Sequence, residues 1–170
     1  KYLDGLTQTD MSKLTQGGQF MTEKEGGSDV GSLTSRAVQE GDHWRLYGDK
    51  WFCSNADAKV VMLLARPDGA GPGTRGVGLF LMPRFLDDGS QNHYRIVRLK
   101  DKLGTRSMAS GEIKLEGAIA YSVGRLDRGF VQMAEMVNSS RLSNGVKSTA
   151  LMRRAWHDAM AVARGRIVFG

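Results

Sequence analysis

The first segment suited to chemistry, residues 21–29, combines hydroxyl groups with adjacent glycines. Thr22 and Ser28 supply the hydroxyls, and Gly26 and Gly27 lie between them. Glycine lets a backbone approach a ligand closely and turn its N–H groups toward an anion. The segment is therefore suited to a phosphate or to the polar edge of a ligand. An ordinary Gly-Gly-Ser-Asp turn is the alternative interpretation.

The second segment, residues 48–55, places an aromatic pair before a hydroxyl. Trp51 and Phe52 are followed by Cys53 and Ser54. An aromatic wall beside a hydroxyl donor can hold a flat apolar ligand that has a polar edge. A Trp-Phe pair buried in a core is the alternative. Together the two segments predict a site for a planar ligand.

In this order and spacing, the two segments resemble the flavin-contacting segments of the acyl-CoA dehydrogenase family, most of all its AidB-like branch. A third segment, residues 99–107, resembles the family's Lys-Leu-Gly-x-Arg-x-Ser motif on the acyl-CoA side. The resemblance covers residues 14–170. It implies FAD as the cofactor, an acyl-CoA thioester as the substrate, and α,β-dehydrogenation with hydride transfer to flavin N5.

The resemblance also implies which residues contact these molecules. Phe52 occupies the position where many members carry a flavin-stacking Trp, so the aromatic wall is kept with a smaller ring. For acyl-CoA it implies Ser28 and Arg141. The implied FAD contacts are Phe20, Met21, Thr22, Gly27, Ser28, Phe52, Cys53, Ser54 and Arg166.

A catalytic base is not expected in this chain. The family's carboxylate usually lies in a later helical segment, beyond Gly170. Some members place it where this chain has Ser140, whose hydroxyl has no suitable pKa for that role. Glu135 is expected to be a surface carboxylate. The chain is therefore expected to be a fragment that is inactive by itself.

The resemblance further implies partners and a location. The parent protein would form a homo-oligomer, either a dimer or a tetramer. It would pass electrons to electron-transfer flavoprotein or to another electron acceptor. The parent would be cytoplasmic in a bacterium, and mitochondrial or peroxisomal in a eukaryote. Two alternative functions are an AidB-like DNA-associated flavoprotein and a non-redox β-barrel that binds a small ligand. Residues 123–170 hold eight Lys or Arg and three acidic residues, a basic balance that suits the first alternative.

The composition of the chain bears on disulfides, metal sites and membrane segments. The single cysteine, Cys53, predicts no internal disulfide and no cysteine-based zinc site, and the three histidines lack metal-ligand spacing. We therefore expect no metal. No apolar run approaches ~20 residues, so no membrane span is expected. The first residues have no apolar segment typical of a signal peptide.

Turn residues divide the first ~120 residues into short strands, which indicates an antiparallel barrel or a nearly closed one. The fold class is therefore α+β, mainly β. Glu40-Gly41-Asp42 between two alternating runs predicts a hairpin. The expected strands are Gln19–Glu23, Leu33–Gln39, His43–Lys50, Val60–Arg66, Gly78–Pro83, Tyr94–Arg98 and Gly111–Leu115.

A helical period follows from Gly129 to Arg164, with no proline. The element is expected to be one long helix, with a kink or a helix pair as alternatives because the stretch 138–143 is poor in helix formers. No other element of the chain can cover its apolar stripe, which predicts packing in a bundle completed by other segments or subunits. The expected domains are a lead-in at 1–13, a β-barrel that binds flavin and acyl-CoA at 14–124, and an incomplete helical domain at 125–170.

Overall fold

A computed structural model describes residues 1–169, and these form two compact units, Lys1–Met133 and a second that begins at Ala134. Gly170, the last residue of the expected helical domain, lies outside the described residues. The helices are α1 (Leu3–Leu6), the 3-10 turns η1 (Val30–Ser32), η2 (Thr74–Gly76) and η3 (Leu126–Arg128), and α2 (Gly129–Gly165). The strands are β1 (Gly17–Phe20), β2 (Arg36–Glu40), β3 (His43–Ser54), β4 (Val60–Pro67), β5 (Gly78–Pro83), β6 (Tyr94–Leu99) and β7 (Ser110–Ser122).

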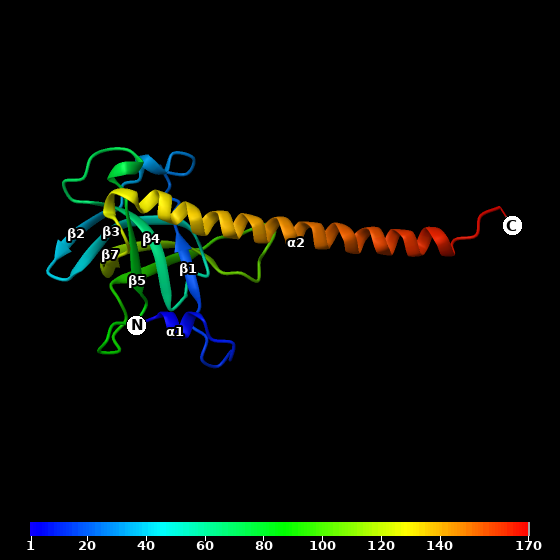
Figure 1. The fold of residues 1–170 in the computed structure, drawn as a ribbon, viewed down its shortest axis with the longest axis horizontal. Helices are drawn as coiled ribbons and strands as arrows, with labels where there is room; N and C mark the ends of the chain where they lie inside the picture. The colour runs from blue at the N-terminus through cyan, green and yellow to red at the C-terminus, as the bar shows by residue number, and fades with distance from the viewer. Residues whose placement is uncertain (170) are drawn as a thin grey trace. The chain divides into compact units, whose positions relative to one another are not determined.

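The strands close into a barrel-like sheet in the first unit, which confirms the predicted fold class (Figure 1). Five strands form the ring in the order β4, β2, β3, β7, β5 and back to β4. β1 joins the ring along β4, and β6 joins it along β7. Closure pairs the edges that an open sheet would leave free.

Two pairings differ from the predicted antiparallel arrangement. β1 and β2 both run parallel to β4, whereas every other pair in the sheet of the described residues is antiparallel. Parallel neighbours need a long connection, and here the β3 strand and the loops around it supply it. Such a crossover is set by contacts distant in sequence, so the turn signals alone did not indicate it.

Several strand boundaries also differ from the predicted ones. β7 continues to Ser122, well past the predicted end at Leu115. Gly117 interrupts the alternating pattern there, but with a φ of 88° it sits at an irregularity inside the strand and does not end it. β2 begins at Arg36 and not at Leu33, because Val30–Ser32 form a 3-10 turn capped by the Asp29 carboxylate.

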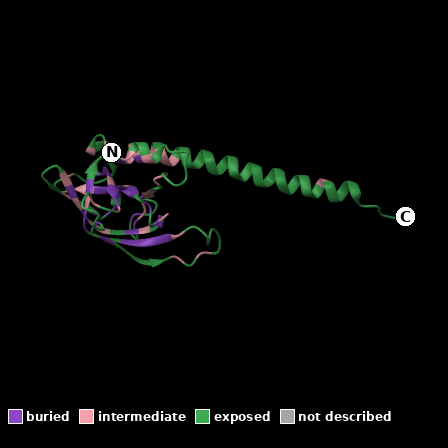
Figure 2. Ribbon diagram, turned by 90° about the horizontal axis from the view of Figure 1, so that it is seen from below, coloured by how far each residue is buried: buried purple, intermediate pink, exposed green. Residues whose placement is uncertain are grey.

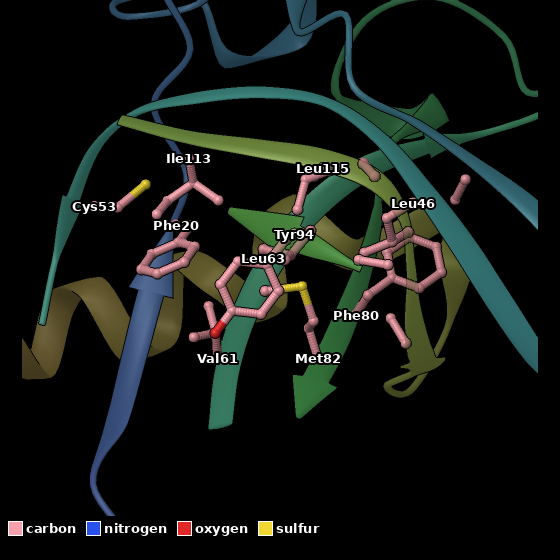
Figure 3. Close-up of a cluster of buried hydrophobic side chains, with 14 of the residues drawn as sticks. Phe20, Leu46, Cys53, Val61, Leu63, Phe80, Met82, Tyr94, Ile113 and Leu115 are labelled. Atoms are coloured by element: carbon pink, nitrogen blue, oxygen red, sulfur yellow. The ribbon is translucent and has the colours of Figure 1, made fainter. Parts of the chain in front are cut away.

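Inward-facing side chains of the ring fill one hydrophobic core, and the buried residues gather on the strands of the first unit (Figure 2). Phe20, Leu63 and Phe80 are among its fully buried members (Figure 3). Each such side chain contributes roughly 1.5–3 kcal/mol relative to an exposed one. The core therefore holds in place the strand ends that carry the candidate site.

The α2 helix begins against the barrel. The Gly129 N–H donates to the Val77 carbonyl at 3.1 Å, and Met133 is fully buried. A Cβ on Gly129 would overlap backbone atoms of Val77, Gly78 and Leu79, so this close approach requires glycine.

Beyond Met133 the helix continues uninterrupted to Gly165, which confirms one long helix over the alternative of a helix pair. The weak helix formers at 138–143 cost only fractions of a kcal/mol each, too little to break a helix of this length. All residues from 138 to 159 are exposed, including apolar Leu142, Val146 and Trp156. In the described part of the chain, no helix has both the length and the hydropathy needed to cross a membrane.

Candidate functional site

A backbone hydrogen bond joins the two segments that the sequence singled out. The Trp51 N–H donates to the Thr22 carbonyl at 2.9 Å. Thr22 follows the end of β1, whereas Trp51 lies inside β3, so the barrel brings together residues about thirty positions apart. Thr22 and Met21 are half-buried, and Ser54 is exposed. The barrel therefore places Thr22 beside the part of β3 that carries Trp51, Phe52 and Ser54.

A β-bulge in β3 turns two successive aromatic side chains away from the core. Lys50 pairs with Ile113 and Cys53 pairs with Gly111, which leaves one extra residue in β3. Lys50 and Cys53 are fully buried, whereas Trp51 is half-buried and Phe52 is 52% exposed. A strand without the bulge would turn one of the two rings inward. The bulge thus provides the aromatic surface that the sequence predicted.

Two of the predicted contact residues have side chains that face inward. Phe20 and Cys53 both belong to the hydrophobic core, as Figure 3 shows. A molecule on the outer surface of the barrel would meet these two residues through their backbone atoms. Their side chains instead hold the strand positions on either side of the exposed groups.

Burial also makes the Cys53 thiol unreactive. Desolvation raises its pKa from 9.0 to about 12, although Lys50 and Lys100 partly oppose the shift. We expect a thiol reagent such as DTNB to label native protein at pH 8 at a rate at least about a hundredfold below that of the urea-unfolded chain. Equal labelling of native and unfolded protein would contradict the buried position.

A buried ion pair supports both segments from inside the barrel. Lys50 Nζ lies 2.6 Å from Glu23 Oε1, and both side chains are at most 1% exposed. Lys50 also donates to the Leu64 carbonyl at 2.7 Å, and Glu23 accepts the Thr34 N–H at 2.6 Å. Motif spacing did not indicate this pair, although a lysine at an inward position of an alternating strand was a usable signal.

In the glycine turn of the first segment, Gly26 is buried and the next two residues are open to solvent. Gly27 and Ser28 are exposed, and no atom lies within 4 Å of the position that a Gly27 Cβ would take. Packing therefore does not require glycine at this position. Asp29 has a structural role, because its carboxylate accepts the Gly31 N–H at 3.0 Å and caps η1.

The third segment reaches the hydroxyl of the second segment. Lys102 Nζ donates to Ser110 Oγ at 3.0 Å and to the Met108 carbonyl at 2.7 Å. Ser110 Oγ lies 3.4 Å from Ser54 Oγ. The Ser54 hydroxyl is thus linked to the loop between β6 and β7, an arrangement that motif spacing alone did not indicate.

The remaining predicted residues lie in the second unit. Arg141 and Arg166 are exposed there, and Arg141 Nη1 lies 3.4 Å from Asn138 Oδ1 of the same helix. Glu135 and Ser140 are exposed as well. Among residues 1–169, no group of three His, Cys, Asp or Glu side chains is arranged to hold a metal ion.

A cavity of about 170 Å³ lies beside Trp51, lined among others by Lys24, Val97 and Glu112. Ligand pockets are commonly about 300–1,000 Å³, so a planar cofactor would not fit inside it. A planar ligand in this region would therefore bind on the open surface around Thr22, Phe52 and Ser54.

Comparison with known proteins gives a consistent result for both sequence and structure. The family model described as acyl-CoA dehydrogenase, middle domain, matches residues 18–118. Acyl-CoA dehydrogenase family member 11 of Caenorhabditis elegans is 44% identical over 99% of this chain and 28% of its own length. Putative acyl-CoA dehydrogenase AidB of Escherichia coli K12 is 42% identical over 90% of this chain and 27% of its own length.

The solved structure of C. elegans ACDH-11 in complex with C11-CoA matches with a TM-score of 0.90 and 42% identity. The match covers 99% of this chain and 29% of that one. The chain thus spans less than a third of the length of these relatives. By both the family match and these identities, it belongs to the acyl-CoA dehydrogenase family of flavoprotein oxidoreductases.

Proposed function

We propose that this chain supplies the FAD-binding β-domain and the first long helix of a longer acyl-CoA dehydrogenase. The observation that supports this most is the hydrogen bond between Trp51 and Thr22 next to the bulge at Phe52. It brings Thr22 next to the part of β3 that carries the exposed Phe52 ring and Ser54. A flavin is a flat plate with a polar edge, so these residue types fit it.

The residues of this chain would bind and orient the cofactor. The Phe52 ring would pack against the flavin, and the Thr22 and Ser54 hydroxyls would donate hydrogen bonds to its polar edge. Backbone N–H groups around Gly27 and the Ser28 hydroxyl would face its phosphates or the acyl-CoA thioester. When bound, FAD would accept the hydride from the thioester's β-carbon.

The second unit would contribute cationic groups. Arg141 would contact the acyl-CoA, and Arg166 would approach a phosphate of FAD. Both are exposed on their own unit, as such roles require. The catalytic carboxylate would come from a segment of the parent protein outside residues 1–170, since Ser140 has no suitable pKa. We accordingly propose that the chain alone is inactive.

The proposed substrate and partners follow the family. C11-CoA is bound in the ACDH-11 structure, and we propose an acyl-CoA thioester as the substrate here too. The parent would be a homo-oligomer that passes electrons to electron-transfer flavoprotein or another acceptor. For domain limits we propose a lead-in at 1–13, the β-domain at 14–124 and the helical domain from 125.

FAD titration tests this proposal, with flavin absorbance and fluorescence as the readout. Both the full-length parent and residues 1–170 should be titrated. We expect saturable binding with a perturbed flavin spectrum in the parent, and weaker binding in the isolated chain. A parent that binds no FAD would overturn the proposal.

The double variant Thr22→Ala/Ser54→Ala tests the assignment of the hydroxyls. Each hydrogen bond contributes about 1 kcal/mol, so their loss should weaken FAD binding about 30-fold. Thr74→Ala/Ser122→Ala is the matched control, because it removes two exposed hydroxyls elsewhere in the first unit. Equal FAD affinity in both double variants would refute the assignment.

A further inference from the structure

A cation is held against Trp51 and Phe52, the aromatic pair whose Phe52 ring we assign to the flavin. Lys100 Nζ lies 3.1 Å from the Trp51 ring centroid and 4.6 Å from that of Phe52. The two rings lie 6.4 Å apart and nearly perpendicular, so one ammonium group contacts both. A cation within about 6 Å of a ring face is attracted by the ring's quadrupole. The Lys100 side chain is only 10% exposed, so water screens this attraction little.

Glu112 holds this cation in place. Its Oε1 atom accepts hydrogen bonds from Lys100 Nζ at 2.6 Å and from Arg98 Nε at 2.7 Å. The Lys100 hydrogen bond, together with Arg98, keeps the pKa of Glu112 below its usual value despite desolvation, so it is ionised at neutral pH. The Lys100 N–H also donates to the Ser110 carbonyl at 2.8 Å. Backbone and side chain of Lys100 are therefore both anchored to β7.

Charged groups of both signs lie around the Trp51 ring, because acidic as well as basic side chains line the cavity beside it. Besides Lys100, the charged groups of Lys24 and Arg98 lie 5.6 and 6.0 Å from its centroid. Glu112 is the carboxylate paired with Lys100 and Arg98. Charge near a flavin changes its electronics, because a positive charge favours the electron-rich reduced form. Removing Lys100 should therefore lower the reduction potential of a bound flavin, whereas removing Glu112 should raise it.

We propose that Lys100 and Glu112 are positioning residues that hold the Trp51–Phe52 pair and set the reduction potential of the bound flavin. Lys100 raises this potential and Glu112 lowers it. The inference rests on the proposed FAD site, and it adds two residues that were not among the implied FAD contacts. A purely structural role would make the two residues act in the same direction, whereas a charge effect makes them act in opposite directions.

The test is the midpoint potential of FAD bound to the full-length parent, measured by dye-linked reductive titration. Lys100→Met should weaken binding of reduced FAD about tenfold relative to oxidised FAD, which lowers the potential by about 30 mV for this two-electron couple. Glu112→Gln should raise the potential by a similar amount. Lys100→Arg keeps the charge and should stay near the wild-type value. In Lys100→Met, Arg98 remains as a partner for Glu112, so the fold should be retained.

The Arg95–Glu116 pair provides the matched control, because it links β6 to β7 at 3.2 Å, as the Arg98–Glu112 pair does. Arg95→Met and Glu116→Gln should leave the potential unchanged. Shifts of the same sign in Lys100→Met and Glu112→Gln, or no shift in either, would overturn this inference while leaving the FAD site standing. A wild-type parent that binds no FAD would overturn both.

Discussion

Replacing Glu23 by Gln is expected to lower the free energy of unfolding by about 3–5 kcal/mol. The variant leaves the Lys50 ammonium buried with only the Leu64 carbonyl and an amide oxygen to accept its hydrogen bonds. An unpaired buried charge is costly, because the low-dielectric interior does not replace its lost hydration. Urea denaturation followed by circular dichroism measures the change.

The double variant Glu23→Gln/Lys50→Met separates the ion pair from general packing damage. The second substitution removes the buried Lys50 ammonium, which has no carboxylate partner in Glu23→Gln. The double variant should therefore be more stable than Glu23→Gln alone. Glu40→Gln is the control, because the Glu40 carboxylate is exposed and its pair with Arg45 should contribute little to stability. A double variant less stable than Glu23→Gln would contradict the ion-pair explanation.

The same carboxylate makes stability depend on pH. Burial alone would raise the pKa of Glu23, but the Lys50 ammonium and the hydrogen bonds from Ser35 and Thr34 outweigh it and hold the pKa below its ordinary value. The native carboxylate therefore binds its proton less readily than the unfolded one. Its stabilising contribution is complete above the unfolded pKa of about 4.3, and it is lost as the pH falls through the lower folded pKa. In Glu23→Gln, the free energy of unfolding should therefore no longer show this pH-dependent contribution.

Phe52→Ala is expected to weaken FAD binding by about tenfold to a hundredfold in the full-length parent. Stacking of a flat heteroaromatic ring on an aromatic side chain contributes about 1–3 kcal/mol, and a factor of ten corresponds to about 1.4 kcal/mol. Phe52 is 52% exposed, so its removal opens no core cavity and the fold should remain intact. Flavin fluorescence titration gives the affinity.

Phe85→Ala is the matched control for this variant. Phe85 is 50% exposed and also has a cation over its ring, with Arg84 Cζ at 5.3 Å from the centroid. Truncating Phe85 should leave FAD affinity unchanged, since this residue lies outside the three segments assigned to the ligands. Similar losses in both variants would mean that the aromatic wall is not at Phe52.

The order of the strands and of the long helix could be predicted from local sequence patterns. Glu40-Gly41-Asp42 indicated a hairpin, and β2 and β3 pair there with Gly41 at a φ of 62°. The proline-free helical period from Gly129 indicated the long helix, and α2 begins at that residue. The segments around Thr22 and Phe52 indicated the family, because motif order and spacing are properties of the chain itself.

The tertiary structure decided which side chains of these segments face a ligand. The bulge that exposes both Trp51 and Phe52 depends on the pairing with Ile113 and Gly111, about sixty residues away. The burial of Glu23 with Lys50 and the position of Lys100 depend on the same closure of the barrel. Such features follow from register between distant strands, and a local pattern of residues carries no information about that register.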